Sequence, residues 1–205
     1  MIALVDYDAG NVKSVDKAIE KLGGEFVLTS DPSVIASADA VILPGVGNFG
    51  DCMDKLKSRG LDEAIRSFAS SGKPFLGICV GLQLLFEESE ESPGVHGLGI
   101  LKGKIRRFPS SDELKVPQIG WNEVLSCKGR LFKGIDEGTF FYFVHSYYLE
   151  ATDPSIVSSK AEYGVTFDSS VESGNVFATQ FHPEKSSDAG LMVLKNFLDI
   201  VKEGK

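Results

Sequence analysis

The stretch "KPFLGICVGLQLLFEES", residues 73–89, decides how the chain is expected to fold, because an apolar run gives way there to helical spacing. The change falls at Cys79, with Gly77 two residues before it and Gly81 two residues after it. Small residues at these positions are typical of a nucleophile elbow, a tight turn from strand to helix. The sequence predicts that the Cys79 thiol stands exposed at the helix N-terminus, where the helix dipole favours the thiolate.

Strand-like and helical segments alternate through the first half of the chain. Short apolar runs predict strands, and apolar residues spaced three and four apart predict helices. The expected strands lie at 2–7, 25–30, 38–47 and 73–79, and the expected helices at 12–22, 50–71 and 80–89. This alternation predicts an α/β fold with a mostly parallel central sheet flanked by helices, in which active sites gather at the carboxyl ends of strands.

The second half changes character, since strand-like runs follow one another with only short turns between them. They lie at 100–108, 118–124, 138–150, 155–163 and 175–181. Such a series predicts antiparallel additions to the sheet. Residues 186–204 then predict an amphipathic closing helix with Ser or Asp as its N-cap. Because no linker interrupts the pattern, we expect one domain over residues 1–205.

Composition narrows the classes of function. The chain has 205 residues and a formal charge of −8, which argues against binding to duplex nucleic acid. We expect no membrane span, because no apolar run approaches the roughly 20 residues that a bilayer requires. Three widely spaced cysteines without zinc-binding spacing predict a reduced, cytoplasmic compartment and no metal or other cofactor.

A thiol nucleophile needs a base, and the chain offers three histidines. His96 lies in a turn, and His145 lies within an apolar strand, where a core or edge histidine is an equally good interpretation. His182 stands where a strand is expected to end, because Pro183 cannot donate to the sheet. Glu184 follows two residues later, and extended geometry would place both side chains on one face. Cys79, His182 and Glu184 therefore predict a catalytic triad, although Cys79 taken alone also fits a buried structural cysteine.

The two motifs resemble the two signatures of class I glutamine amidotransferases, and the resemblance covers essentially the whole chain. The matching stretches are residues 77–83 and 181–184. The resemblance implies that Cys79 attacks the side-chain amide of glutamine, that ammonia leaves, and that water hydrolyses the γ-glutamyl thioester. It makes His182 the acid and base and Glu184 the residue that orients His182.

Three further stretches resemble one branch of that class, the amidotransferase subunits of imidazole glycerol phosphate synthases. They are "PGVGNFG" at 44–50, "GWNEV" at 120–124 and "FYFVHSY" at 141–147. Read without the resemblance, they are a glycine-rich turn and two core strands. The resemblance assigns glutamine binding to Gly45, Gly47, Gln83, Glu91, His145, Ser146 and Tyr147, and a partner interface to Asn11, Trp121, Tyr142 and Lys185.

The resemblance also implies a partner, a cyclase subunit with a (β/α)₈-barrel fold. That subunit would receive the ammonia and convert the phosphoribulosyl formimino intermediate PRFAR to imidazole glycerol phosphate and AICAR. This chain carries no phosphate-binding glycine motif, as expected if the phosphorylated substrate binds to the partner.

The oxyanion that forms on glutamine needs two hydrogen-bond donors. Val80 N–H supplies one, and we expect the second from Val46 and Gly47, since Gly45 and Gly47 let the intervening peptide rotate. The resemblance implies that this oxyanion hole is incomplete until the partner is loaded. Three alternatives remain open: an amidotransferase that serves another synthase or acts alone, a binding module with an inactive triad, and a cysteine peptidase or γ-glutamyl hydrolase.

Overall fold

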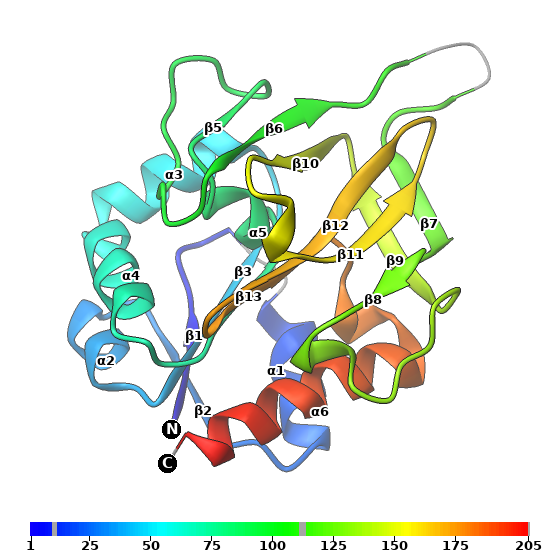
Figure 1. The fold of residues 1–205 in the computed structure, drawn as a ribbon. Helices are drawn as coiled ribbons and strands as arrows, with labels where there is room; N and C mark the ends of the chain where they lie inside the picture. The colour runs from blue at the N-terminus through cyan, green and yellow to red at the C-terminus, as the bar shows by residue number, and fades with distance from the viewer. Residues whose placement is uncertain (10–11, 111–113, 205) are drawn as a thin grey trace.

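A mixed sheet runs through the computed structural model, which describes residues 1–9, 12–110 and 114–204 (Figure 1). Its strand order is β2-β1-β3-β4-β13-β12-β10-β6-β5. The first five strands in this order run parallel, and most are buried along their whole length, as strands covered on both faces are. They are β2 (Phe26–Thr29), β1 (Ile2–Val5), β3 (Ala40–Gly45), β4 (Phe75–Cys79) and β13 (Val176–Thr179). The predicted fold class is thus confirmed.

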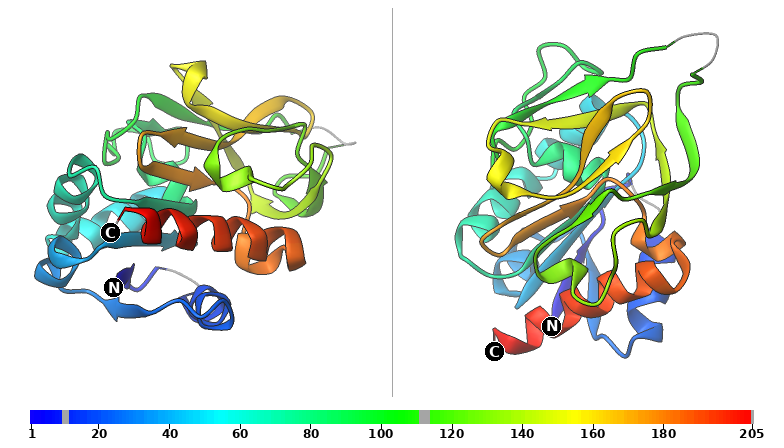
Figure 2. Two further views of the ribbon diagram at one scale, coloured as in Figure 1. Left: turned by 60° about the horizontal axis from the view of Figure 1, so that its bottom comes forward. Right: turned by 45° about the vertical axis from the view of Figure 1, so that its right-hand side comes forward.

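Two groups of helices cover the two faces of this parallel part (Figures 1 and 2). One group contains α1 (Val12–Lys21) and α6 (Ser187–Glu203), and the other contains α2 (Pro32–Ser37), α3 (Phe49–Ser58) and α4 (Leu61–Ser70). The segment 50–71, predicted as one helix, is two helices because Gly60 adopts a left-handed conformation with φ of 66°. Among the described residues, no helix combines the length and apolar character that spanning a membrane requires.

The other half of the sheet is largely antiparallel, as predicted. It contains β5 (Glu88–Ser89), β6 (Gly103–Arg107), β8 (Ser126–Cys127), β10 (Tyr147–Ala151), β11 (Val157–Glu162) and β12 (Thr166–Ser173). Two details differ from the prediction. The strand expected at 175–181 is β13, which pairs parallel with β4, and β12 was not among the expected strands.

A separate two-stranded sheet pairs β7 (Gln118–Glu123) with β9 (Phe140–His145). The run 138–150, expected as one strand, changes sheets at Ser146, since β9 ends at His145 and β10 begins at Tyr147. Short 3-10 helices complete the chain: η1 (Arg130–Phe132), η2 (Pro154–Ile156) and η3 (Pro183–Lys185).

The topology brings three strand ends together. In the register of the sheet, Gly45 at the end of β3 lies opposite Cys79 at the end of β4, and Thr179 of β13 lies opposite Ile78. The segment between β9 and β10 lies across the same edge, because His145 and Tyr147 share a pocket with Cys79. Any site at this edge is therefore built from four stretches that are far apart in the sequence.

Candidate active site

Cys79 stands on a strained turn between β4 and α5 (Val80–Leu84), with φ of 55° and ψ of −111°. A positive φ at a non-glycine residue costs free energy and is concentrated at functional sites. The glycines on either side make the turn possible. A Cβ on Gly81 would lie 1.9 Å from the Leu43 carbonyl oxygen, and one on Gly77 would lie 2.8 Å from the Gly81 carbonyl oxygen. This is the close approach that the elbow motif predicts.

The Cys79 side chain is buried, however, with only 3% of its surface exposed. The prediction of an exposed thiol at the start of a long helix is therefore wrong in two respects. The thiol lines the inside of a pocket of about 400 Å³, and α5 is a helix of five residues. The walls come from the loop after β3 and from the β9–β10 segment, which the isolated elbow motif does not reveal.

His182 and Glu184 form a buried pair. His182 Nδ1 lies 2.8 Å from Glu184 Oε1, and both side chains are almost fully excluded from solvent. His182 follows β13, and Pro183–Lys185 is the 3-10 helix η3. The pairing agrees with the prediction, but its geometric reason does not, since a helical turn rather than an extended strand brings Glu184 back to the imidazole.

The charges around His182 keep its imidazole protonated. Burial lowers the pKa of His182, but the negative charges of the Cys79 thiolate and of Glu184 outweigh burial and raise it to about 10. The second ring nitrogen, Nε2, has no hydrogen-bond partner among the described residues, and His182 lines the pocket with Cys79. The arrangement is a cysteine and a histidine in one pocket, with the other ring nitrogen of the histidine held by a carboxylate.

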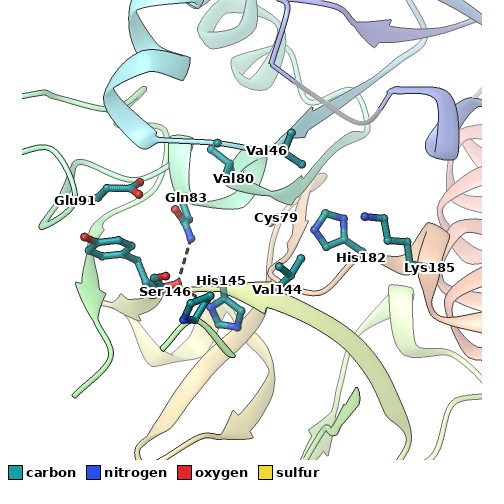
Figure 3. A pocket seen from close by; sticks show the side chains of 13 residues that line it. Val46, Cys79, Val80, Gln83, Glu91, Val144, His145, Ser146, His182 and Lys185 are labelled. Carbon is teal, nitrogen blue, oxygen red and sulfur yellow. Dashed lines mark hydrogen bonds between the residues drawn. The ribbon is translucent and has the colours of Figure 1, made fainter. Parts of the chain in front are cut away.

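Most residues that the resemblance assigns to glutamine line this pocket. They are Gly47, Gln83, Glu91, His145, Ser146 and Tyr147. Figure 3 shows Glu91 and Gln83 toward one side of the pocket and His182 and Lys185 toward the other, with Cys79 between them. Gly45 is not part of the lining. Pro117 and Val144 also line the pocket, although neither was among the predicted site residues.

Hydrogen bonds fix the polar side chains at the Glu91 end. Glu91 Oε2 accepts from Phe49 N–H at 2.8 Å, at the start of α3, and burial raises the pKa of Glu91. Gln83 Nε2 donates to the Tyr147 carbonyl at 3.2 Å and to Gln180 Oε1 at 3.1 Å. Gln180 itself was not predicted, although a glutamine within an apolar strand pattern is a signal for a buried polar role.

His145 is a neutral, buried member of the lining. Its Nδ1 lies 2.8 Å from the Tyr147 carbonyl, and burial lowers its pKa to about 4. Because a carbonyl oxygen only accepts, Nδ1 carries the proton and Nε2 is the free acceptor. The ring packs against Phe108, Phe143 and Phe167. His145 therefore unites the two interpretations of the sequence, a histidine in an aromatic core and a residue of the pocket.

The two expected oxyanion donors differ in this structure. Val80 is the first residue of α5, directly after the nucleophile. Val46 N–H, in contrast, donates to the Ala9 carbonyl oxygen at 3.4 Å. Gly47, next along the chain, has φ of 106° and open space around its Cα, so this stretch has the conformational freedom that its glycines predict. Val80 N–H thus belongs to the residue directly after the nucleophile, whereas Val46 N–H is engaged with Ala9.

Three of the four residues assigned to a partner interface lie together beside the pocket. The Trp121 and Tyr142 rings are 6.4 Å apart on paired positions of β7 and β9, and Lys185 Nζ lies 5.8 Å from the Tyr142 ring. Trp121 is 51% exposed and its neighbour Ile119 is 65% exposed. Asn11 lies outside the described residues. Within the part of the chain that the structure describes, no group of His, Cys, Asp and Glu could hold a metal ion.

Comparisons with known proteins agree with this geometry. The family model described as glutamine amidotransferase class-I matches residues 3–201. A protein of Syntrophotalea carbinolica, named imidazole glycerol phosphate synthase subunit HisH, is 50% identical over 206 residues that cover 98% of this chain and 100% of the relative. Proteins of the same name from Methanothermobacter thermautotrophicus and Moorella thermoacetica are 48% and 51% identical, over 98% of this chain and 100% and 95% of theirs.

Solved structures share the fold at low sequence identity. A glutamine amidotransferase structure superposes with a TM-score of 0.75 at 21% identity and covers 98% of this chain and 100% of its own. The PurLQS structure from Thermotoga maritima gives 0.72 at 23% identity, over 97% of each chain. These solved structures establish the fold alone. The closer sequence similarity is to the curated relatives, which are about 50% identical to this chain.

Proposed function

Because the chain belongs to the class I glutamine amidotransferases, we propose that it is the glutaminase subunit of an imidazole glycerol phosphate synthase and that Cys79, His182 and Glu184 perform the hydrolysis. The observation that carries the proposal is the buried constellation of a thiol on a strained elbow and a histidine held by a carboxylate in one pocket. The curated relatives, about half identical over nearly their full length, support the choice of synthase.

Glutamine enters with its side-chain amide toward Cys79. Glu91, at the opposite end of the pocket, is an anion suited to the α-ammonium group of the substrate. The Gln83 amide nitrogen is already committed to Tyr147 and Gln180, so Gln83 receives a substrate N–H through its Oε1. Binding both ends of the substrate fixes the amide carbon near the sulfur, which is the main benefit of orientation in a two-reactant step.

The first half-reaction forms a thioester. The Cys79 thiolate attacks the amide carbon, and Val80 N–H donates to the oxygen that becomes negative. His182 then gives its Nε2 proton to the amide nitrogen, the C–N bond breaks, and ammonia leaves. A histidine whose pKa is about 10 holds this proton at neutral pH until the leaving group takes it.

The second half-reaction regenerates the enzyme. Neutral His182 takes a proton from water, and the resulting hydroxide attacks the thioester carbon. When the C–S bond breaks, glutamate is released, Cys79 returns as the thiolate and His182 as the imidazolium. Glu184 holds Nδ1 throughout, so that Nε2 faces the reacting atoms in both steps.

The resting oxyanion hole gives this site a means of control. With Val46 N–H bonded to Ala9, one of the donors expected for the oxyanion is occupied. Removing one oxyanion donor typically costs about 10²–10³ in kcat. A loaded partner that binds the state with a free Val46 N–H more tightly would shift the population toward that state and restore this factor.

The exposed face of the β7–β9 sheet fits the partner. Ile119 and Trp121 project from β7, and Phe140, 53% exposed, lies on the same side of β9. A cluster of exposed apolar and aromatic side chains marks a protein interface rather than ordinary surface. We propose that a (β/α)₈-barrel cyclase docks here, takes up the ammonia and converts PRFAR to imidazole glycerol phosphate and AICAR.

The experiment that tests this function is a glutaminase assay of the chain alone, with the cyclase subunit, and with the cyclase loaded with PRFAR. We expect slow hydrolysis by the chain alone and a rise of about 10²–10³ in kcat in the loaded complex, with a smaller change in KM. Activity without a partner equal to that of the complex would instead indicate a free glutaminase. The three free cysteines, of which Cys79 acts as a thiolate, suit the reduced cytoplasm that we propose as the location.

A further inference from the structure

Gln180 is a buried amide that neither the triad nor the assigned substrate contacts explain. It follows β13, two residues before His182, and is fully excluded from solvent. Its Nε2 lies 3.8 Å from Cys79 Sγ, and its Oε1 lies 3.1 Å from Gln83 Nε2. The side chain therefore bridges the nucleophile and a residue assigned to substrate binding.

The orientation of this amide follows from a backbone group. The Tyr147 carbonyl oxygen can only accept, so the Gln83 atom at 3.2 Å from it must be the NH₂ group. The same Gln83 NH₂ group lies next to Gln180, so the Gln180 atom facing it must be the oxygen. The NH₂ group of Gln180 consequently faces the sulfur. The chain of bonds from Tyr147 thus decides which end of Gln180 meets Cys79.

A hydrogen bond donated to sulfur matters most when the sulfur is negative. Bonds to an ionised partner are stronger than bonds between neutral groups, so an N–H donor favours the thiolate over the thiol. The helix that follows Cys79 has only five residues, which makes it a weak source of dipole stabilisation. A side-chain donor is therefore a significant addition to the charge of His182.

We infer that Gln180 holds the Cys79 thiolate by a hydrogen bond from its NH₂ group, and that Gln83 is the positioning residue that keeps this amide in the required orientation. The inference rests on the proposed function, since it extends the role of the same nucleophile. It gives Gln83 two tasks, one toward glutamine and one toward Cys79, and it links occupancy of the substrate end of the pocket to the state of the sulfur.

The test is the pH dependence of Cys79 alkylation by iodoacetamide, followed by mass spectrometry of the peptide that contains Cys79. This reaction needs neither glutamine nor the cyclase, so its outcome is independent of the glutaminase assignment. The other titratable groups facing the site are the same in every variant; they are His145, Tyr147, His182, Lys185, Glu91 and Tyr7. Burial raises the pKa of Cys52 and of Cys127 to about 11, so both should alkylate slowly at neutral pH.

Gln180→Met keeps the length of the side chain and removes the donor. We expect its alkylation profile to move up by about one pH unit, which is about a tenfold slower reaction on the rising limb. In the loaded complex, kcat for glutamine should fall with little change in KM. Gln180→Glu keeps an acceptor for Gln83, removes the donor to sulfur and adds a negative charge beside it, so it should shift the profile in the same direction and further than Gln180→Met does, even if the methionine variant does not fold.

Asn196→Leu is the matched control. Asn196 is another buried amide whose NH₂ group donates to two carbonyls, those of Leu131 and Lys133, but it lies on α6 outside the pocket. It should lower stability and leave the Cys79 profile unchanged. The inference is overturned if both Gln180 variants alkylate with the wild-type profile, or if Asn196→Leu shifts the profile as much as they do.

Discussion

Glu184→Gln is the substitution whose effect the structure defines most sharply. Glu184 Oε1 accepts from His182 Nδ1 at 2.8 Å, while Oε2 is buried without a hydrogen-bond partner among the described residues. The change therefore alters one interaction and keeps the shape of the side chain. Because the buried imidazolium loses its charged partner, we expect the variant to fold but to be less stable than the wild type at neutral pH.

The expected magnitude follows from the charge on that bond. A hydrogen bond to a charged group contributes about 1.5–3 kcal/mol, and one pKa unit corresponds to about 1.4 kcal/mol, so the pKa of His182 should fall by about 1–2 units from its value of about 10. The pKa of His182 should fall rather than rise, because the carboxylate stabilises the imidazolium. Its proton should therefore be lost at lower pH in the variant, and the basic limb of the glutaminase profile should move down with it.

Neutral pH and alkaline pH should then give different losses. At pH 7 His182 still keeps its proton in the variant, so only orientation is lost and kcat should drop by about tenfold. At about pH 9 the imidazolium itself is depleted and the loss should grow. The three histidines allow His182 to be followed directly by NMR titration. An unchanged titration of His182, or a loss of activity that does not vary between these pH values, would refute the reasoning.

The other substitutions separate the roles within the complex. Cys79→Ala should abolish glutamine-dependent synthesis and leave ammonia-dependent synthesis intact, and loss of both in an assembled complex would contradict the assignment. His182→Asn should be as damaging as Cys79→Ala, and the double variant no worse than either, because residues acting as a unit are not additive; steady-state hydrolysis measures this. Trp121→Ala should raise the Kd for the cyclase by about 30-fold or more, as loss of an interface anchor does, and a titration showing unchanged affinity would remove Trp121 from the interface.

The local chemistry of the site could be predicted because it lies in short motifs. Gly77, Cys79 and Gly81 predict the elbow since a Cβ on Gly77 would clash with Gly81 itself, and the contact of His182 with Glu184 spans two residues. The parallel part of the fold was equally accessible, since continuous apolar runs alternate with helical spacing. These features depend on interactions within a few residues of sequence.

The features that could not be predicted from the sequence depend on contacts between distant segments. Cys79 lies in a pocket whose lining includes Ser146 and Tyr147, where a run that reads as one strand leaves one sheet for another. The sequence pattern can indicate that Gln180 is buried, but its contacts with Gln83 and Cys79 appear only in the folded chain. Val46 N–H donates to the carbonyl of Ala9, 37 residues earlier in the chain. Hydrophobic periodicity does not predict a hydrogen bond between residues so far apart.

The low glutaminase activity expected of the chain alone should therefore come from the Val46–Gly47 stretch and not from Cys79, His182 and Glu184. His182 is held by Glu184 and lines the same pocket as Cys79, whereas Val46 N–H is engaged with Ala9. Iodoacetamide reacts at a saturated carbon and develops no carbonyl oxyanion, so it reports on the thiolate alone.

We expect the alkylation rate of Cys79 to differ by less than about tenfold between the chain alone and the loaded complex, while kcat for glutamine rises by about 10²–10³. Both rates are measured at the same pH, and Cys79→Ala gives the background for each. Equal increases in the two rates would mean that the partner activates the thiolate itself. In that event Val46 would lose its regulatory role, and control would rest on the pairing of Cys79 with His182.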